Sequence, residues 1–236
     1  MKKLYAVASL LIVALSCQPK ENILPDYPGW YSIKSPERQP AQAVYGDLDG
    51  TLIVASLFTI YFTTNKGKSW QLANYPPNAD RSLRLGLFGF AVRNDTLIVL
   101  NSTDIRSTDP VHYAADPFYY SLDKGVNWQR YKGIDRVRSP INSLRSSSGT
   151  TYAVREKLIP VPNSTRDFYV LTTGVYTSDN RELTLPQRHQ IKSLAFDSKQ
   201  RLMIAASAPL CNTPPEDFKF CGDDYGRIYI SKEAQP

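Results

Sequence analysis

Apolar and polar positions alternate in short runs along most of the chain, and four stretches share one outline. Each stretch starts with a short apolar run, passes through a polar or glycine-containing turn, and ends in a second run of β-branched or aliphatic residues. This outline is typical of β-hairpins. The four stretches are residues 43–55, 90–100, 143–154 and 193–205. Because the outline recurs, we expect a repeat architecture built from strands.

Two eight-residue turns, one after each of the first two hairpins, have matching side chains. The first is Thr63-Thr64-Asn65-Lys66-Gly67-Lys68-Ser69-Trp70, and the second is Ser121-Leu122-Asp123-Lys124-Gly125-Val126-Asn127-Trp128. A hydroxyl at the first position can bond across the turn, and a carboxylate or amide at the third can accept backbone N–H bonds. The glycine permits a positive φ, and the Trp can bury a large apolar area.

Both turns fit the pattern Ser/Thr-x-Asp/Asn-x-Gly-x-x-Trp, which resembles the Asp-box, or BNR repeat, of sialidases and other β-propellers. The resemblance implies one such hairpin in each blade of a propeller. It also implies that the matched residues are markers of the fold and not parts of an active site. These structural residues are Thr63, Asn65, Gly67, Trp70, Ser121, Asp123, Gly125 and Trp128.

The third and fourth repeats carry altered versions of the turn. The third reads Thr177-Ser178-Asp179-Asn180-Arg181, with Arg in place of the glycine and no Trp after it. The fourth runs through residues 226–233, and the sequence ends at Pro236, inside the turn. The segment 28–33, which contains Trp30, looks like an outer strand with no turn before it. We expect this segment to pair with residues 227–231 and to close a ring.

The predicted fold is therefore all-β: a small β-propeller of about four blades in residues 28–236, closed by its N-terminal strand. Unit starts near residues 30, 70, 128 and 184 give blades of about 40–58 residues. Four blades is the low end for propellers. Two alternatives are a shortened piece of a six- or seven-bladed propeller and one arc of an oligomeric ring.

The first residues predict export and a lipid anchor. Residues 1–16 combine two lysines with an apolar run that is too short to span a membrane but suits a signal peptide. The run ends Ala14-Leu15-Ser16-Cys17, which resembles a bacterial lipobox. Lipidated Cys17 would then anchor the protein to the outer membrane of a bacterial envelope through acyl chains, and residues 17–27 would form a tether. The alternative is ordinary cleavage with Cys17 left as a thiol.

Cysteine and histidine content limits the chemistry of the remaining chain. Cys211 and Cys221 flank a Pro-rich, acidic loop, and in an exported protein we expect them to form a disulfide. His112 and His189 are the only two histidines in the sequence. A zinc site is therefore improbable, we expect no cofactor, and no G-x-S-x-G nucleophile motif is present.

The charge balance argues against a nucleic-acid binder. The net charge is +6, and it falls to +4 when the signal peptide with Lys2 and Lys3 is removed. A nucleic-acid-binding protein would show clustered Lys and Arg among base-stacking aromatic residues.

One arginine precedes each repeat at the same distance, six residues before the inner strand reference positions at 44, 90, 144 and 194. These arginines are Arg38, Arg84, Arg138 and Arg188. If the fold is a propeller, they approach one axis and could bind carboxylate, sulfate or phosphate groups. Val137-Arg138-Ser139-Pro140 weakly resembles the Phe/Tyr-Arg-Ile-Pro motif of sialidases. The alternative is that the arginines stack on neighbouring blades or pair with acidic residues such as Asp80 and Asp135.

The sequence thus predicts a membrane-anchored lipoprotein with a non-catalytic binding or scaffolding propeller, whose ligand is an anionic group, an acidic glycan or an envelope protein. The runner-up is a sialidase-like glycoside hydrolase, which would need a Tyr nucleophile paired with a Glu. No catalytic residue is assigned, because the sequence does not place such a pair. A third alternative is an assembly factor or accessory subunit of an envelope complex.

Overall fold

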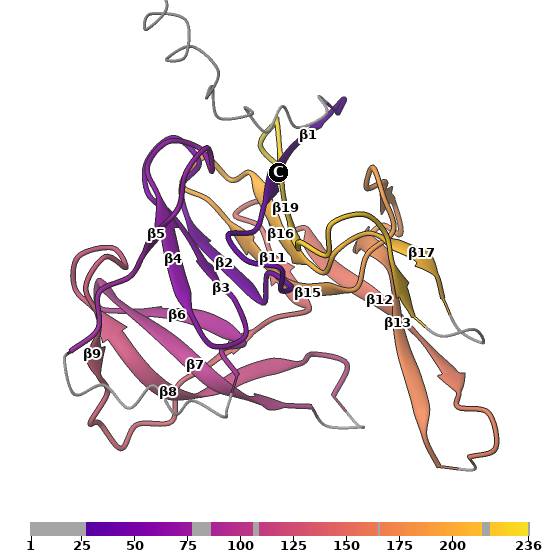
Figure 1. Ribbon diagram of the computed structural model, residues 1–236, viewed down its shortest axis with the longest axis horizontal. Coiled ribbons are helices and arrows are strands. Elements are labelled where there is room, and N and C mark those ends of the chain that lie inside the picture. Colours follow the sequence, from indigo (N-terminus) through magenta and orange to yellow (C-terminus); the bar gives the residue numbers. More distant parts are fainter. Residues whose placement is uncertain (1–26, 77–85, 106–108, 165, 214–217, 236) are drawn as a thin grey trace, which may run out of the picture.

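The computed structural model describes residues 27–76, 86–105, 109–164, 166–213 and 218–235. Every helix or strand in this part of the chain is a β-strand. The predicted signal peptide, Cys17 and most of the predicted tether lie outside the described residues, as does Arg84. Four antiparallel sheets surround a common centre as the blades of a four-bladed β-propeller (Figure 1).

Each blade follows one predicted repeat, numbered from its inner to its outer strand. Blade 1 contains β2 (Ala43–Gly46), β3 (Leu52–Ala55), β4 (Ile60–Thr63) and β5 (Gln71–Leu72). Blade 2 contains β6 (Gly89–Arg93), β7 (Thr96–Asp104), β8 (Tyr113–Ser121) and β9 (Gln129–Arg130), and β10 (Arg138–Pro140) pairs with the start of β8. Blade 3 contains β11 (Ser143–Arg145), β12 (Thr151–Pro160), β13 (Phe168–Thr177) and β14 (Glu182–Leu183). Blade 4 contains β15 (Ile191–Phe196), β16 (Leu202–Ala206), β19 (Arg227–Ser231) and β1 (Trp30–Lys34).

The N-terminal strand β1 closes the ring, as the sequence predicts. It pairs antiparallel with β19 from Trp30 opposite Ser231 to Lys34 opposite Arg227. Trp30 also donates its indole N–H to the carbonyl oxygen of Thr184, at 3.0 Å, at the end of the outer strand of blade 3. The four blades therefore close within this one chain, and no second copy is needed to complete the circle.

Apolar side chains fill the four junctions between neighbouring blades. The junctions of blades 1 and 2, blades 3 and 4, and blades 4 and 1 each contain a large buried cluster. The fourth cluster has only three buried apolar residues, Ile98, Leu100 and Ala114, and its members come from blade 2 and the segments that flank it. Apolar burial stabilises the ring in proportion to area, so we expect the junction of blades 2 and 3 to be the weakest of the four.

The two Trp-terminated turns, residues 63–70 and 121–128, share two hydrogen bonds from backbone N–H groups to side chains. In the first, the N–H of Gly67 donates to the hydroxyl of Thr63 at 3.1 Å, and the N–H of Ser69 donates to the Asn65 side chain at 3.0 Å. In the second, the equivalent bonds join Gly125 to Ser121 at 2.9 Å and Asn127 to Asp123 at 2.9 Å. The expected structural chemistry of the motif is thus present in both turns.

Gly67 is required for two separate reasons. Its φ of 78° lies in the left-handed region that favours glycine. A Cβ atom there would also lie 2.2 Å from Cγ2 of Ile33 in blade 4. The third turn, where Arg181 replaces the glycine, keeps the bond from the Arg181 N–H to the Thr177 hydroxyl at 3.1 Å. Only Asn180 has a positive φ there.

A small hairpin stands on the long connection between β16 and β19. It consists of β17 (Leu210–Asn212) and β18 (Lys219–Phe220). Cys211 and Cys221 form the predicted disulfide across its base, with Cα atoms 5.3 Å apart. The bond fixes an insertion that would otherwise have many conformations.

Candidate functional site

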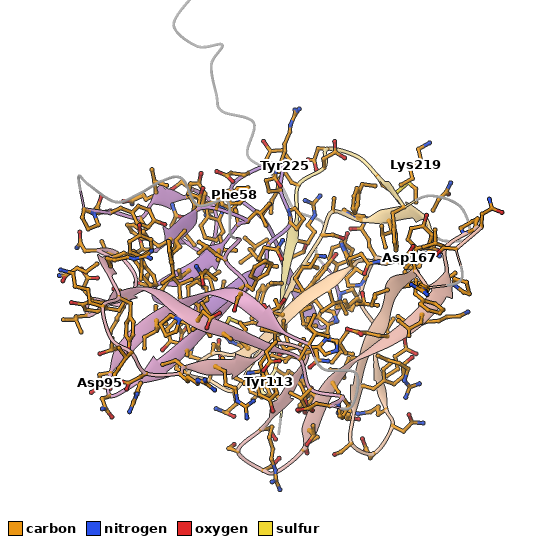
Figure 2. All side chains as sticks on the ribbon, turned by 90° about the horizontal axis from the view of Figure 1, so that it is seen from below. Phe58, Asp95, Tyr113, Asp167, Lys219 and Tyr225 are labelled. Carbon is orange, nitrogen blue, oxygen red and sulfur yellow. A yellow bond between two sulfur atoms is a disulfide. The ribbon has the colours of Figure 1, made fainter. Side chains whose placement is uncertain are left out.

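The strand order sorts the connections of the propeller onto two opposite faces. In a four-stranded antiparallel blade, the first-to-second and third-to-fourth turns lie at one end, which we call the turn face. The second-to-third connections and the links between blades lie at the other end, which we call the loop face. In Figure 2, Lys219 and Tyr225 from the blade 4 connection mark one edge of the molecule, and Asp95 from the β6–β7 turn marks the opposite edge.

Long connections are concentrated on the loop face. Blade 1 joins its second and third strands through residues 56–59 alone. In blades 2 and 3 the second and third strands are joined through the long outer halves of the β7–β8 and β12–β13 hairpins. In blade 4 they are joined through residues 207–226. Since binding residues usually lie on loops held by a rigid scaffold, the loop face is the candidate site.

The residues that lie three places after the four arginines in the sequence occupy equivalent structural positions. The residue three places after each arginine donates its backbone N–H to the preceding blade. The bonds run from Ala41 to Ala206 O at 3.1 Å, from Leu87 to Leu57 O at 2.8 Å, from Ile141 to His112 O at 2.9 Å and from Ile191 to the Thr172 hydroxyl at 2.8 Å. The three described arginines, Arg38, Arg138 and Arg188, therefore precede equivalent points on the loop face.

The three described arginines of this register are exposed and have different neighbours. Arg38 lies over the ring of Tyr225 at 5.9 Å, and Arg138 lies over the ring of Tyr113 at 4.4 Å. Arg188 donates to the carbonyl oxygen of Cys211 at 3.2 Å. The stacking expected from the sequence as an alternative thus occurs at Arg38 and Arg138. Asp135, the acidic partner suggested with it, instead pairs with Arg93 at 3.0 Å. Among the described residues, no two of these arginines share a contact partner.

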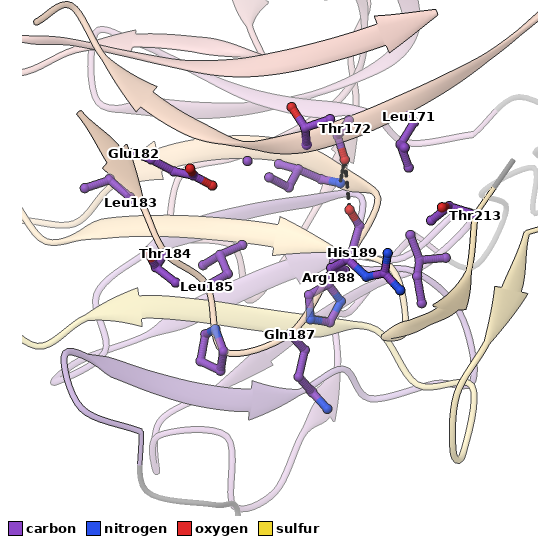
Figure 3. Close-up of a pocket in the computed structure, with 15 residues that line it drawn as sticks. Leu171, Thr172, Glu182, Leu183, Thr184, Leu185, Gln187, Arg188, His189 and Thr213 are labelled. Carbon is purple, nitrogen blue, oxygen red and sulfur yellow. Dashed lines mark hydrogen bonds between the residues drawn. The ribbon is translucent and has the colours of Figure 1, made fainter. Parts of the chain in front are cut away.

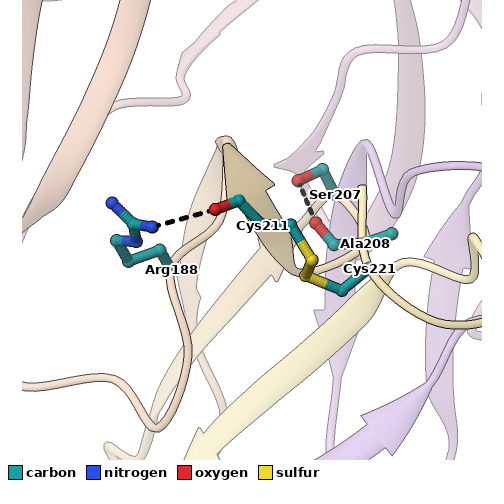
Figure 4. The surroundings of a disulfide bond; sticks show 5 residues. All are labelled: Arg188, Ser207, Ala208, Cys211 and Cys221. Atoms are coloured by element: carbon teal, nitrogen blue, oxygen red, sulfur yellow. Dashed lines mark hydrogen bonds between the residues drawn. A yellow bond between two sulfur atoms is a disulfide. The ribbon is translucent and has the colours of Figure 1, made fainter. Parts of the chain in front are cut away.

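Arg188 lies in a cavity of about 470 Å³ between blades 3 and 4. Figure 3 shows its lining of both polar and apolar side chains, which come largely from β13, β14 and the segment that leads into β15. The lining includes Thr172, Thr173, Glu182, Thr184, Gln187 and Arg188. Figure 4 shows that the guanidinium contacts the backbone beside the disulfide. The disulfide hairpin therefore positions Arg188 at this cavity.

The imidazole of His189 is buried beside the cavity and has a structural role. Its Nδ1 lies 2.8 Å from the carbonyl oxygen of Ser207, which only accepts, so Nδ1 carries the proton. Its Nε2 then accepts from the hydroxyl of Tyr229 at 2.8 Å. Burial lowers the pKa of His189 to about 4. The ring is therefore neutral at pH 7, and both its nitrogen atoms are engaged within the protein.

Three hydrogen-bond donors at the start of β15 have no acceptor among the described residues. They are the ammonium of Lys192, Nε2 of Gln190 and the hydroxyl of Ser193. The Thr172 N–H donates to Oε1 of Gln190 at 3.3 Å, which fixes the orientation of that amide. Burial lowers the pKa of Lys192. Unpaired buried donors are costly, so this group is the part of the loop face best suited to an anion.

The sequence interpretation missed Lys192, although one signal was present. Lys192 is the one charged residue in the strand Ile191-Lys192-Ser193-Leu194-Ala195-Phe196. It sits where the pairing of β15 with β16 shifts register between Ile191 and Ser193. A bulge of this kind redirects a side chain, and it is not visible in the sequence.

A tyrosine–glutamate pair, which the runner-up function requires, is present in blade 1. The hydroxyl of Tyr61 donates to the carboxylate of Glu37. Burial and the nearby Glu37 carboxylate raise the pKa of Tyr61. The phenol is therefore protonated at neutral pH. Neither residue lines the cavity beside Arg188.

The turn face carries a compensated ionic cluster between blades 4 and 1. Arg201 is almost fully buried and bonds to Asp197 at 2.6 Å and to Asp49 at 3.0 Å. Lys199 and Lys66 also contact Asp49, at 2.7 and 2.9 Å. Because these charges satisfy one another, we interpret the cluster as structural.

Comparisons with known proteins add a limited finding. No protein-family model matches the chain, and no curated protein sequence is significantly similar to it. Among solved structures, the chain is similar to YCF48 from Cyanidioschyzon merolae, with 13% identity and a TM-score of 0.35, over 81% of this chain and 75% of that chain. It is also similar to a structure described as YCF48 bound to D1 peptide, with 14% identity and a TM-score of 0.24, over 88% and 98% of the two chains. At these TM-scores the likeness carries no functional conclusion, and the propeller assignment rests on the strand pairing.

No helix in the described part of the chain is long and apolar enough to cross a membrane. No group of three or more His, Cys, Asp or Glu side chains in the same part of the chain is arranged to hold a metal ion.

Proposed function

We propose that this protein is an exported, membrane-anchored lipoprotein whose propeller, of the Asp-box type, binds or scaffolds without catalysis and recognises an anionic ligand on its loop face. The ligand would be an acidic glycan or an acidic segment of an envelope protein. The observation that carries the proposal is the set of unpaired donors at Gln190, Lys192 and Ser193. Arg188 stands four residues before Lys192 and adds a second cation.

The chemistry of these donors favours a carboxylate, sulfate or phosphate group. An ammonium, an amide N–H and a hydroxyl can all donate to an anionic oxygen, and such charge-assisted bonds are stronger than neutral ones. Lys192 is only partly buried, so a ligand group can reach its ammonium from solvent, whereas Nε2 of Gln190 and the hydroxyl of Ser193 are buried. Binding would supply an acceptor for Lys192.

An array of acidic glycans tests the proposal. We expect the purified protein to bind glycans with uronate, sialate or sulfate groups, and to bind the carboxyl-reduced or desulfated counterparts at least about tenfold more weakly. Equal binding to charged and neutral partners, or no binding to any acidic glycan and to any acidic peptide on the same array, would contradict anion recognition.

Lipid anchoring has its own test at Cys17. We expect labelled palmitate to be incorporated into the protein expressed in a bacterium, and the label to be lost in Cys17→Ala. Cys211→Ala is the control, since it also removes a cysteine, in this case from the Cys211–Cys221 disulfide, but should keep the label. Incorporation that persists in Cys17→Ala would exclude this residue as the anchor.

The Tyr61–Glu37 pair supports one second candidate, a sialidase-like glycoside hydrolase. This function predicts release of a fluorophore from a sialoside, and loss of that turnover in Tyr61→Phe. Absence of turnover at high protein concentration would eliminate it. The third alternative, an accessory subunit of an envelope complex, predicts a membrane partner that co-purifies in stoichiometric amount.

A further inference from the structure

The β12–β13 hairpin of blade 3 extends well beyond its sheet. The inner strand β11 pairs with β12 only from Thr151 to Ala153, and β14 pairs with β13 only at Val175 and Tyr176. The outer half of the hairpin, residues 155–160 and 168–173, therefore projects from the loop face as a two-stranded arm (Figure 1). Isolated two-stranded ribbons are only marginally stable, so an arm of this length is suited to receive a further strand.

One edge of the arm has free backbone groups. The N–H of Val154 donates to the carbonyl oxygen of Asn142, on the side of β12 away from β13. The N–H and C=O groups of successive residues point to alternate sides of a strand. The bulge in this pair of strands inserts its extra residue, Thr173, into β13, so the alternation along β12 is not interrupted. Glu156 and Leu158 therefore direct their N–H and C=O groups to the same outer edge. Among the described residues, no bond satisfies these groups.

Large apolar side chains are exposed next to this edge. Leu158 pairs with Val170 on one face of the arm, and their exposed fractions are 60% and 45%. Phe168, on the same face, is 50% exposed, and Ile105 at the end of the β7–β8 hairpin is 60% exposed. Ile105, Leu158 and Val170 line one cleft of about 840 Å³. A cluster of exposed apolar side chains marks an interaction surface.

The inner end of the cleft is held in place by polar contacts. Asn142 accepts from the N–H of His112 at 2.8 Å and donates to the carbonyl oxygen of Pro110 at 3.0 Å. His112 also lies 3.4 Å from the Glu156 carboxylate. These contacts fix the β7–β8 hairpin against β12, so the cleft exists before any partner binds.

We propose that this cleft binds an extended segment of a partner protein, which adds as a strand to the free edge of β12. A row of backbone donors and acceptors at strand spacing is matched by another polypeptide backbone. Alternate side chains of the segment would be apolar, against Leu158 and Val170. The others would be acidic, because the exposed Lys157 stands on the opposite face of the arm.

A second copy of this chain fits the edge poorly. Antiparallel pairing of two β12 edges centred on Leu158 would place Lys157 opposite Ile159 and diagonally across from the Lys157 of the second copy. Two like charges would then lie on the same face of neighbouring strands. The surface also differs from the donors at Lys192, so it goes beyond the anion recognition proposed above.

The test uses synthetic peptides of about six residues, the usual length of a strand. One peptide alternates Val and Glu, a second has the same composition in two blocks, and a third alternates Val and Lys. In fluorescence anisotropy titrations we expect the first peptide to bind at least about tenfold more tightly than the other two. Equal affinities, or no binding of the first peptide at about 1 mM, would overturn the proposal.

Two variants sharpen this test. Leu158→Pro removes one free N–H, which an edge strand tolerates, and should abolish peptide binding while acidic-glycan binding is unchanged. Lys157→Glu should shift the preference to the Val–Lys peptide. If Lys157→Glu leaves the peptide preference unchanged, the proposed strand addition is refuted. It is also refuted if the wild-type protein sediments as a dimer and Leu158→Pro sediments as a monomer.

Discussion

Arg201 is the residue whose loss should destabilise the ring most through charge. Its guanidinium compensates Asp197, whose side chain is fully buried. Removing one partner of a buried ion pair leaves an unpaired charge, which typically costs about 3–5 kcal/mol. We expect Arg201→Met to lose stability of this order in urea unfolding. Lys199→Ala, which removes an exposed partner of Asp49, should cost much less, because solvent screens exposed ion pairs. Equal losses in the two variants would contradict the role of burial.

His189 should make stability depend on pH in a defined window. Its pKa is about 4 in the folded protein and 6.5 in the unfolded chain, so the unfolded state binds the proton more readily. The contribution of neutral His189 to the free energy of unfolding is therefore fully present above pH 6.5. It is lost as the pH falls through 4, by roughly 3 kcal/mol in total. The measurement is urea unfolding between pH 7 and pH 4, and His189→Gln should show a shallower loss than the wild type. Parallel curves would exclude His189 as the source.

At the scale of single elements, the turn at Gly67 should couple blade 1 to blade 4. Gly67→Ala introduces both a strained φ and a contact with Ile33, and we expect it to cost about 2–4 kcal/mol. Gly222→Ala is the matched control, because its φ is also positive at 74° but nothing lies within 4 Å of the added Cβ. It should cost only about 1 kcal/mol.

A double-mutant cycle separates the two causes. If the contact with Ile33 matters, Gly67→Ala in an Ile33→Ala background should cost at least about 1 kcal/mol less than in the wild type. A cost that is the same in both backgrounds would assign the whole effect to backbone strain.

The elements that the sequence predicts are those with local signals. The four hairpins follow from short apolar runs and turn residues, and the closing strand at Trp30 follows from a missing outer strand in the last repeat. The free donors at Lys192 and the hydrogen bonds of His189 depend on a bulge and on side chains from other blades. The arm of blade 3 depends on where β11 and β14 stop pairing. These features arise from tertiary packing, which the periodicity of a single strand does not encode.

At the scale of the whole molecule, the ring should open first between blades 2 and 3. The only buried cluster beside that junction is Ile98, Leu100 and Ala114 of blade 2, whereas the clusters of the other three junctions are much larger and contain residues of both blades. Less buried apolar area means a lower free energy of local opening. Native-state hydrogen exchange should therefore show faster exchange at β10 and β11 than at β16 and β19. Uniform protection in all four blades would contradict an uneven ring.

The division into a structural turn face and a binding loop face is the central claim, and two charge-removing variants test it most directly. Lys192→Met removes a cation from the loop face, and Lys68→Met removes an exposed cation from the turn face. Calorimetric titration measures the affinity of each variant for the acidic glycan that binds most tightly on the array. The two variants have the same net charge, so the comparison isolates the position of the lost cation. We expect Lys192→Met to weaken binding at least about tenfold, or ~1.4 kcal/mol, and Lys68→Met to leave it unchanged. Equal weakening in the two variants, or a loss only in Lys68→Met, would contradict the assignment of the binding face.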